Sequence, residues 1–393
     1  MSRCPNCFTE IDPDIYCWLC TSGACSESRD DQASRYMGVS VERTPTVGVE
    51  RPSGAKKWEP PSVSCPVCKL PTSTEACPAC HYPWPDDYRY SETICLAMTG
   101  ARTTGKSSYV AVVIRALEAL LRETKVALVP ATPATGMLFE RVYERPLLGY
   151  RIIDPTRADA ENLLRDQEPL IWAMGAESGR PRYLVLRDLP GEALEGGVGQ
   201  APFLTLIARA DAVFFMFDPL KVPQIVAQLT NVIPAPGNLG GDPQRVLDVV
   251  LKLMAPEGNG RLAIVVSKFD TLEALREVEG TEWSLIMSNA GSAVLRCPPE
   301  EIGYDEDDGV LVNEEVRSLL LKLGAEPLVI SLEHPPSGQL VPHRFFVVSA
   351  LGHPPRGEAL NRRGIAPHRC LDPLKWVLAQ RGVIPIVGPA PAF

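Results

Sequence analysis

The 393-residue sequence lacks a long apolar stretch, an excess of positive charge and an export signal. Its apolar runs, such as Ala212–Phe217, are far shorter than the ~20 residues that a membrane-spanning helix needs. Lys and Arg total 39 against 48 Asp and Glu, a formal net charge of −9, so neither nucleic acid nor an anionic membrane surface is an expected partner. The first residues, MSRCPNC, contain no apolar signal core. We therefore expect a cytoplasmic protein without a membrane partner.

The cysteines are concentrated near the N-terminus, since nine of the twelve precede residue 81. Eight of them form four C-x-x-C pairs, and two such turns can supply four thiolates to a closed tetrahedral zinc site. We expect two structural zinc ribbons, each built from two consecutive pairs. The predicted zinc ligands are Cys4, Cys7, Cys17 and Cys20 in the first ribbon and Cys65, Cys68, Cys77 and Cys80 in the second. Iron could occupy the same ligands.

Other features of the cysteine-rich region favour a docking role. A disulfide framework would need an oxidising compartment, and no export signal accompanies the pairs. Cys25, Cys95, Cys297 and Cys370 remain unpaired. Acidic residues outnumber basic ones in both ribbons, so we expect them to dock a protein rather than nucleic acid. Residues 26–62 have no apolar period and are expected to be a flexible linker.

From Ser91 onward, apolar runs alternate with helical patterns, which predicts an α/β domain with a mostly parallel sheet. Four of the runs lead directly into polar motifs; these runs are Thr93–Thr99, Tyr183–Arg187, Leu262–Val266 and Arg344–Val348. Because open parallel sheets bind ligands at the carboxyl ends of their strands, we expect the four motifs to face one site.

The first motif is a complete phosphate loop, G-x-x-x-x-G-K-S, between a strand and a helical pattern. Its backbone N–H groups would surround the β-phosphate of a nucleotide, Lys106 would reach the β- and γ-phosphate oxygens, and the Ser107 hydroxyl would bind magnesium. The predicted nucleotide-binding residues of this loop are Gly100, Ala101, Arg102, Thr103, Thr104, Gly105, Lys106, Ser107 and Ser108.

The second motif, Asp188-Leu-Pro-Gly191, offers a carboxylate for magnesium and the N–H of Gly191 for the γ-phosphate. The third and fourth motifs suit a guanine base. The Asp270 carboxylate can accept hydrogen bonds from guanine N1–H and the N2 amino group, which adenine cannot match, and the Lys268 stem can stack on the base. A backbone N–H of the fourth motif would lie near the guanine carbonyl. The predicted base-binding residues are Ser267, Lys268, Asp270, Ser349, Ala350 and Leu351.

Through these motifs the chain resembles, over about residues 91–383, the P-loop GTPases of the translation-factor-like and Ras-like class. The resemblance implies a GTP-dependent switch with magnesium. The base motif of that class usually begins with Asn or Thr, where this chain has Ser267. The position that orients the attacking water, often Gln or His, is Glu192, whose carboxylate the γ-phosphate repels. We therefore expect slow intrinsic hydrolysis, with a catalytic arginine from Arg102, from Arg157 or from a partner.

A switch of this kind needs a threonine that binds magnesium only while the γ-phosphate is present. Thr132, Thr135 and Thr156 compete for this role. We favour Thr156 because it directly precedes the predicted strand pair that leads to Asp188, although a helix N-cap would explain this threonine equally well.

The paired ribbons, the Asp188–Glu192 stretch and the closing helix from Asp372 resemble the bacterial double-GTPase proteins, which are encoded beside GTPase-associated proteins in conflict or signalling operons. This resemblance implies a protein partner, such as a GTPase-associated protein or a second GTPase.

The predicted fold is an α/β P-loop NTPase with a mostly parallel central sheet flanked by helices and preceded by two zinc ribbons. The predicted domains are residues 1–25 (first ribbon), 26–62 (linker), 63–90 (second ribbon), 91–383 (GTPase domain with insertions at about 124–168 and 280–341) and 384–393 (tail). The predicted function is a GTP-binding and GTP-hydrolysing switch whose ribbons dock a protein. Two alternatives stay open: a P-loop ATPase or nucleotide kinase in which Asp270 plays no part, and a nucleotide-bound scaffold whose ribbons bind nucleic acid.

Overall fold

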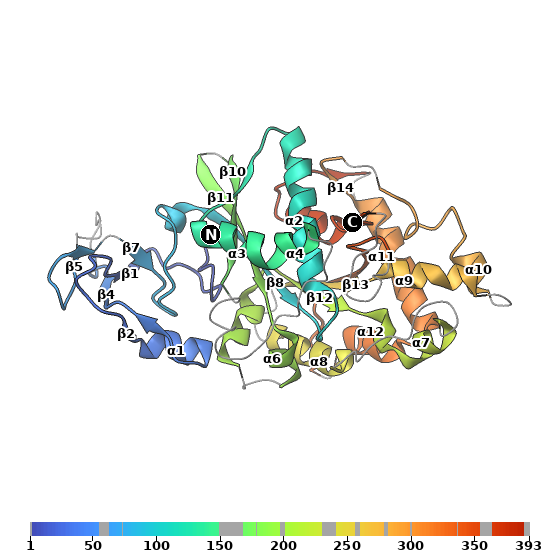
Figure 1. Ribbon diagram of the computed structural model, residues 1–393, viewed down its shortest axis with the longest axis horizontal. Coiled ribbons are helices and arrows are strands. Elements are labelled where there is room, and N and C mark those ends of the chain that lie inside the picture. The colour runs from blue at the N-terminus through green and yellow to red at the C-terminus, as the bar shows by residue number, and fades with distance from the viewer. Residues whose placement is uncertain are drawn as a thin grey trace.

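A central sheet with helices on both faces forms the body of the protein, and a smaller cysteine-rich module lies at one end of it (Figure 1). The computed structural model describes residues 2–54, 63–72, 74–148, 168–177, 179–196, 201–229, 241–255, 260–278, 282–298, 301–335, 337–353 and 364–388. Within these ranges, no helix is both long and apolar enough to cross a membrane.

The central sheet has seven strands in the order β15-β13-β12-β8-β11-β10-β9. Their bounds are β8 Glu92–Thr99, β9 Leu128–Pro130, β10 Leu170–Glu177, β11 Arg180–Asp188, β12 Ala212–Phe217, β13 Arg261–Val266 and β15 His343–Val347. The five strands from β15 to β11 pair in parallel, whereas β10 and β9 are added antiparallel at the edge next to β11. The mostly parallel α/β fold expected from the sequence is therefore confirmed.

Strand β12 shows why these segments form a sheet that is buried on both faces. All six of its residues are apolar and buried, which is typical of a central parallel strand. Because side chains alternate along a strand, Val213 and Phe215 enter one core cluster, and Phe214 and Met216 enter the other.

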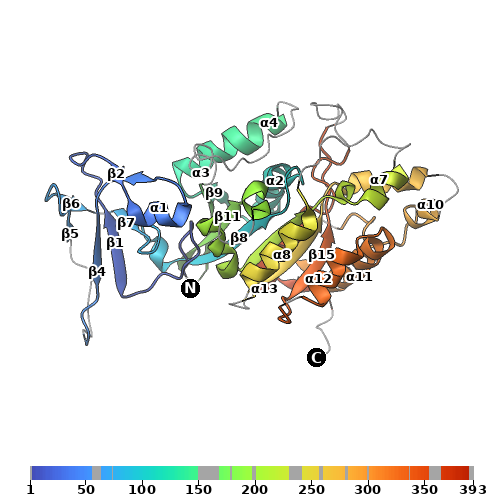
Figure 2. The same cartoon turned by 90° about the horizontal axis from the view of Figure 1, so that it is seen from below.

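The two core clusters divide the helices between the two faces of the sheet. Figure 2 looks onto the face that carries α8 (Pro243–Met254). One face is covered by α2 (Lys106–Glu123), α3 (Pro133–Leu138), the π-helix η2 (Phe139–Glu144) and α13 (Asp372–Gln380). The other face is covered by η3 (Pro202–Arg209), α7 (Pro223–Leu229), α8 (Pro243–Met254), α9 (Phe269–Glu273), α11 (Glu306–Lys322) and α12 (Glu326–Glu333). Short elements complete the domain: α4 (Arg145–Leu148), α6 (Gly191–Glu195), η4 (Pro219–Lys221), η5 (Ala274–Glu277), α10 (Trp283–Ile286), β14 (Tyr304–Asp305) and β16 (Ile386–Val387).

The cysteine-rich module is one unit rather than two ribbons joined by a tether. Its three-stranded sheet, in the order β4-β1-β7, takes one strand from each of the three predicted segments. The elements of the module are β1 (Ile15–Leu19), β2 (Ser28–Arg29), α1 (Asp31–Met37), β3 (Glu42–Arg43), β4 (Thr46–Glu50), β5 (Val63–Ser64), β6 (Pro71–Thr72), β7 (Thr74–Ala76) and η1 (Tyr88–Tyr90).

The expected flexible linker at residues 26–62 is therefore wrong for its described part, residues 26–54. Strand β4 pairs antiparallel with β1 along five residues. Backbone hydrogen bonds to β1 therefore hold this segment in the sheet, although its sequence has no apolar period. Helix α1 begins at an N-cap, Asp30, whose side chain accepts from the N–H groups of Gln32 and Ala33. Helix α1 buries Ala33 and Met37 in the core cluster shared with the sheet.

Candidate nucleotide site and candidate metal centres

The phosphate loop connects β8 to α2 and passes close to the end of β12. Gly100 has φ 135°, and a Cβ there would lie 2.4 Å from the carbonyl oxygen of Met216, so only glycine fits. Gly105, at φ 86°, is the N-cap of α2, and Thr103 also has a positive φ of 62°. The buried Thr104 hydroxyl donates to the Ala101 carbonyl at 3.0 Å. The loop therefore leads into a helix N-terminus, as a phosphate site requires.

Lys106 is the first residue of α2 and points back into this loop. Its Nζ donates to the carbonyls of Gly100 and Ala101 at 3.1 and 3.2 Å, and only 6% of the residue is exposed. Burial lowers the pKa of the Lys106 ammonium, and the nearby carboxylates of Asp188 and Glu195 oppose that shift. The site thus holds a buried cation beside the loop carbonyls. The following Ser108 is the third residue of α2, which begins at Lys106.

Ser107 and Asp188 meet at the ends of α2 and β11. The Ser107 hydroxyl donates to Asp188 Oδ2 at 3.1 Å, and both residues are buried. Tyr143, from η2, also places its hydroxyl 3.4 Å from this carboxylate oxygen. Hydroxyl and carboxylate oxygens are the ligand type that Mg²⁺ takes in nucleotide sites, so the residues present fit such an ion. No sequence motif pointed to Tyr143, which lies in an insertion.

Gly191 brings the second motif against the phosphate loop. A Cβ at this position would lie 2.6 Å from the backbone nitrogen of Arg102 and 2.8 Å from the carbonyl carbon of Ala101. Such contacts exclude any side chain. The segment after Asp188 therefore packs directly on the phosphate loop, as expected if the first and second motifs face one site.

Two carboxylates of α6 lie over the same stretch of loop. Glu192 accepts from the Arg102 guanidinium at 3.0 Å, and Glu195 accepts from the Arg102 backbone N–H at 3.2 Å. Glu195 was not identified from the sequence, because a second glutamate in a short helix has no motif of its own. Lys221 lies near the same acidic groups. Burial lowers the pKa of its ammonium, and the carboxylates of Asp218 and Glu195 oppose that shift.

The third and fourth motifs also meet. The Ser349 hydroxyl donates to Asp270 Oδ1 at 2.5 Å, and the N–H of Phe269 donates to the carbonyl of Val348 at 3.1 Å. Burial raises the pKa of the Asp270 carboxyl, and the Ser349 hydrogen bond opposes the shift. Ser267 lies at the end of β13, where its hydroxyl donates to the Phe217 carbonyl at 3.0 Å.

Lys268 is held by an acid that the sequence did not reveal. Its Nζ lies 2.5 Å from Oδ2 of Asp218, a fully buried residue at the end of β12. Lys268 itself has a left-handed backbone, φ 52°. Ala350 and Leu351 follow Ser349 in the loop after β15, and Leu351 accepts from the N–H of Ala366 at 3.2 Å.

Of the three candidate switch threonines, the structure describes Thr132 and Thr135. Thr132 caps α3 and accepts from the N–H of Thr135, so both hydroxyls are engaged locally. Thr156, together with Arg157, lies outside the described residues.

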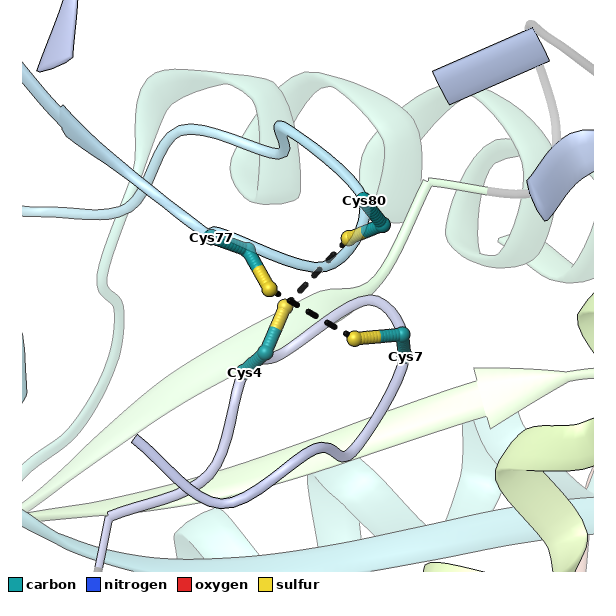
Figure 3. A group of neighbouring side chains, drawn as sticks. All are labelled: Cys4, Cys7, Cys77 and Cys80. Atoms are coloured by element: carbon teal, nitrogen blue, oxygen red, sulfur yellow. Dashed lines mark hydrogen bonds between the residues drawn. The ribbon is translucent and has the colours of Figure 1, made fainter. Parts of the chain in front are cut away.

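Two groups of four cysteines could each hold a metal ion: Cys4, Cys7, Cys77 and Cys80 in the first centre (Figure 3), and Cys20, Cys25, Cys65 and Cys68 in the second. In both centres, the sulfur pairs that approach each other lie 3.6 to 3.7 Å apart. A tetrahedral zinc site with Zn–S bonds of about 2.3 Å has sulfur–sulfur edges of about 3.8 Å. The residues present therefore fit zinc, and the second centre is nested in sequence inside the first.

The predicted grouping was wrong in two respects: consecutive pairs do not share a centre, and Cys25 replaces Cys17. Cys17 lies inside β1 and is buried in a small apolar cluster with Leu19 and Ala76, whereas Cys20 follows the end of the strand and belongs to the second centre. Burial raises the pKa of the Cys17 thiol to about 12, as for a neutral core residue.

The local sequence carried a signal for this difference. In the three pairs that converge, proline follows the first cysteine, and the residue after the second cysteine has a positive φ; these residues are Phe8, Lys69 and His81. Cys17 is followed instead by tryptophan, inside an apolar strand-like run.

Known proteins are similar to this chain to different degrees. No family model matches the chain. It is 44% identical, over 98% of its length and 100% of the relative's, to the "Putative ESX-1 scaffolding and assembly protein SaeC" of Mycolicibacterium smegmatis.

Solved structures of GTPase-like proteins are also similar. The S. cerevisiae Ski7 GTPase-like domain bound to GTP has 12% identity and a TM-score of 0.32, covering 69% of this chain and 48% of that one. A variant of Aquifex aeolicus Era bound to GDP·AlF₄⁻ has 13% identity and a TM-score of 0.26, covering 76% and 59%. The chain thus spans about half the length of the Ski7 structure. With TM-scores this low, the likeness transfers neither a ligand nor an activity to this chain.

Proposed function

We propose that this chain, which belongs to the same protein family as SaeC, is a magnesium-dependent guanine-nucleotide switch that acts on a protein assembly. The observation that carries the proposal is the hydrogen bond between Ser107 and Asp188, 3.1 Å long, beside the buried ammonium of Lys106. This arrangement brings a phosphate loop, a buried cation and two oxygen ligands to the ends of neighbouring strands.

The proposed binding mode assigns each group one task. The N–H groups of the loop and Lys106 would neutralise the β- and γ-phosphates, and Gly191 would bring its N–H toward the γ-phosphate. Ser107 and Asp188 would hold Mg²⁺, which supplies positive charge to the phosphates when it is bound. Asp270, oriented by Ser349, would read the guanine edge.

Hydrolysis is proposed to be slow without a partner. The carboxylate of Glu192 is poorly suited to orient a water beside an anionic phosphate, and it accepts a hydrogen bond from Arg102 at 3.0 Å. Engaged in this way, Arg102 does not neutralise charge on the transferring phosphoryl group. A partner that supplies an arginine, or separates the pair, would therefore accelerate turnover.

The partner is proposed to be a protein. The relative SaeC is named as a scaffolding and assembly protein, which supports protein rather than nucleic-acid partners. The two metal centres would hold zinc and give the cysteine-rich module a rigid surface for docking. The resemblance to double-GTPase proteins of conflict or signalling operons also predicts a protein partner, and this prediction is untested.

The experiment that tests the proposal is a titration of the purified full chain with fluorescent GDP and ADP in Mg²⁺, followed by single-turnover hydrolysis of GTP. We expect tight guanine binding, weak adenine binding and slow hydrolysis. Equal affinity for both bases would support the ATPase alternative, and no binding of either nucleotide would reject the switch.

A further inference from the structure

Arg187 is a fully buried cation directly before Asp188 on β11. It is 0% exposed, and its Nη1 donates to the side-chain oxygen of Asn6. Within the described ranges, its Nε and Nη2 have no hydrogen-bond partner, and no carboxylate forms an ion pair with it. A buried guanidinium needs a compensating negative charge, because arginine stays protonated in proteins.

Asn6 connects this guanidinium to the first metal centre. It lies between Cys4 and Cys7 in the sequence; its backbone N–H donates to Cys4 Sγ at 3.4 Å and its Nδ2 donates to Cys80 Sγ at 3.5 Å. Four thiolates around one zinc ion carry a formal charge of −2. The side-chain amide of Asn6 thus accepts from the buried cation and donates to one sulfur ligand, that of Cys80.

Tyr36 makes a second contact with Asn6. Its hydroxyl donates to the Asn6 carbonyl at 3.0 Å. Burial raises the pKa of the Tyr36 phenol; the positive charge of Arg187 opposes this shift, whereas Cys4 and Cys80 add to it. The phenol therefore lies within electrostatic reach of both the guanidinium and the sulfur group.

The module also contacts the chain beyond the second motif. Helix α1 packs on η3, where the hydroxyl of Tyr36 approaches the carbonyl of Phe203 at 3.5 Å. A Cβ on Gly38 would lie 3.1 Å from Pro202 Cδ. The stretch that carries Gly191 and α6 is therefore flanked by two contacts with the same module, one before it at Arg187 and one after it at η3.

We propose that the metal centre of Cys4, Cys7, Cys77 and Cys80 is a positioning element of the nucleotide site, in which its thiolate charge compensates Arg187 through Asn6 and so fixes Asp188. For its effect on nucleotide, this inference rests on the proposed function. The second centre has no such link, since its described hydrogen bonds stay within the module, to Ser22 among others.

The test compares Asn6→Ala with Ser22→Ala, which removes the equivalent polar neighbour of the second centre. Metal content is measured first, and both variants are expected to retain two zinc ions. Hydrogen exchange of nucleotide-free protein should then be faster across residues 183–196 and 201–209 in Asn6→Ala and unchanged in Ser22→Ala. The Mg²⁺ concentration that half-saturates GDP binding should rise about tenfold or more in Asn6→Ala alone.

Further variants separate this inference from misfolding and from failure of the proposed function. Cys80→Ser, which retains one metal, should show the same faster exchange, whereas Cys68→Ser should not; if Cys80→Ser does not fold, Asn6→Ala decides. Wild-type exchange across residues 183–196 and 201–209 in metal-loaded Asn6→Ala would overturn the positioning role. If the wild type binds no nucleotide, the proposed function fails, and the exchange data alone still decide whether the centre supports β11.

Discussion

The Arg102 guanidinium donates to Glu192 at 3.0 Å, and the backbone N–H of Arg102 donates to a second carboxylate of the same short helix, Glu195, at 3.2 Å. Two negative groups therefore cover part of a loop whose N–H groups are suited to phosphate. A triphosphate that enters this loop must displace them or accept their repulsion. In the proposed nucleotide site, these two carboxylates would therefore oppose the binding of a triphosphate.

The substitution Glu195→Gln should strengthen GTP binding. It removes a negative charge beside the loop while keeping a hydrogen-bond acceptor for Arg102, so GTP affinity should rise about three- to tenfold, with a smaller gain for GDP. The measurement is competition against a fluorescent nucleotide at constant ionic strength. Glu118→Gln, on the outer part of α2, is the charge-matched control; a gain of similar size there would contradict the local repulsion.

Lys106→Ala should abolish nucleotide binding. The ammonium of Lys106 is buried beside the loop carbonyls, and loss of its charge-assisted hydrogen bonds to phosphate should reduce affinity by about 100-fold or more. Lys252→Ala, at an exposed position of α8, removes the same charge elsewhere and should bind as the wild type does. Retained affinity in folded Lys106→Ala, with an unchanged circular dichroism spectrum, would place the nucleotide elsewhere.

Asp270→Asn should remove the preference for guanine. The amide can no longer accept both guanine hydrogen bonds, so GDP affinity should fall about 100-fold. Xanthine carries an oxygen in place of the N2 amino group, and the side-chain amide that the substitution introduces could donate to this oxygen; XDP should therefore bind the variant better than GDP does. A variant that keeps its guanine preference would show that Asp270 does not read the base.

The same substitution should stabilise the nucleotide-free protein at neutral pH. Burial raises the pKa of Asp270 above its unfolded value, so the folded state binds the proton more tightly, and stability is lost as pH rises through the folded pKa. Asp270→Asn avoids this loss. Its melting temperature should exceed that of the wild type at pH 7 to 8, and the difference should shrink as pH falls toward the unfolded value. A constant difference at all pH values would contradict this origin.

Cysteine substitutions should distinguish the two groupings of metal ligands. Cys25→Ser should lose about one of two zinc ions per chain, because it removes a ligand from the second centre, while Cys17→Ser should retain both. Metal is measured by mass spectrometry after dialysis against a weak chelator. Loss of zinc from Cys17→Ser but not from Cys25→Ser would restore the consecutive grouping expected from the sequence.

Local sequence was sufficient to identify the sheet and its polar strand ends. The apolar run of β12 and the glycines of the phosphate loop reflect local requirements, because a parallel strand buried on both faces must be apolar and because Gly100 and Gly105 have positive φ angles. In the same way, the convergence of Asp270 and Ser349 follows from strand ends that lie at one edge of the sheet.

Only the tertiary structure decided the contacts made between distant segments. Which pairs of cysteines share a centre depends on a strand, β4, that the composition of residues 26–62 did not indicate; only the exclusion of Cys17 had a local signal, the tryptophan that follows it. The acids Glu195 and Asp218 belong to no motif and acquire their place through folding alone. A motif of closely spaced residues reflects the conformation of one short stretch of backbone, so it can be identified from local sequence. The partner of a buried charge cannot be identified in this way, because Arg187 and Asn6 are 181 residues apart in the chain.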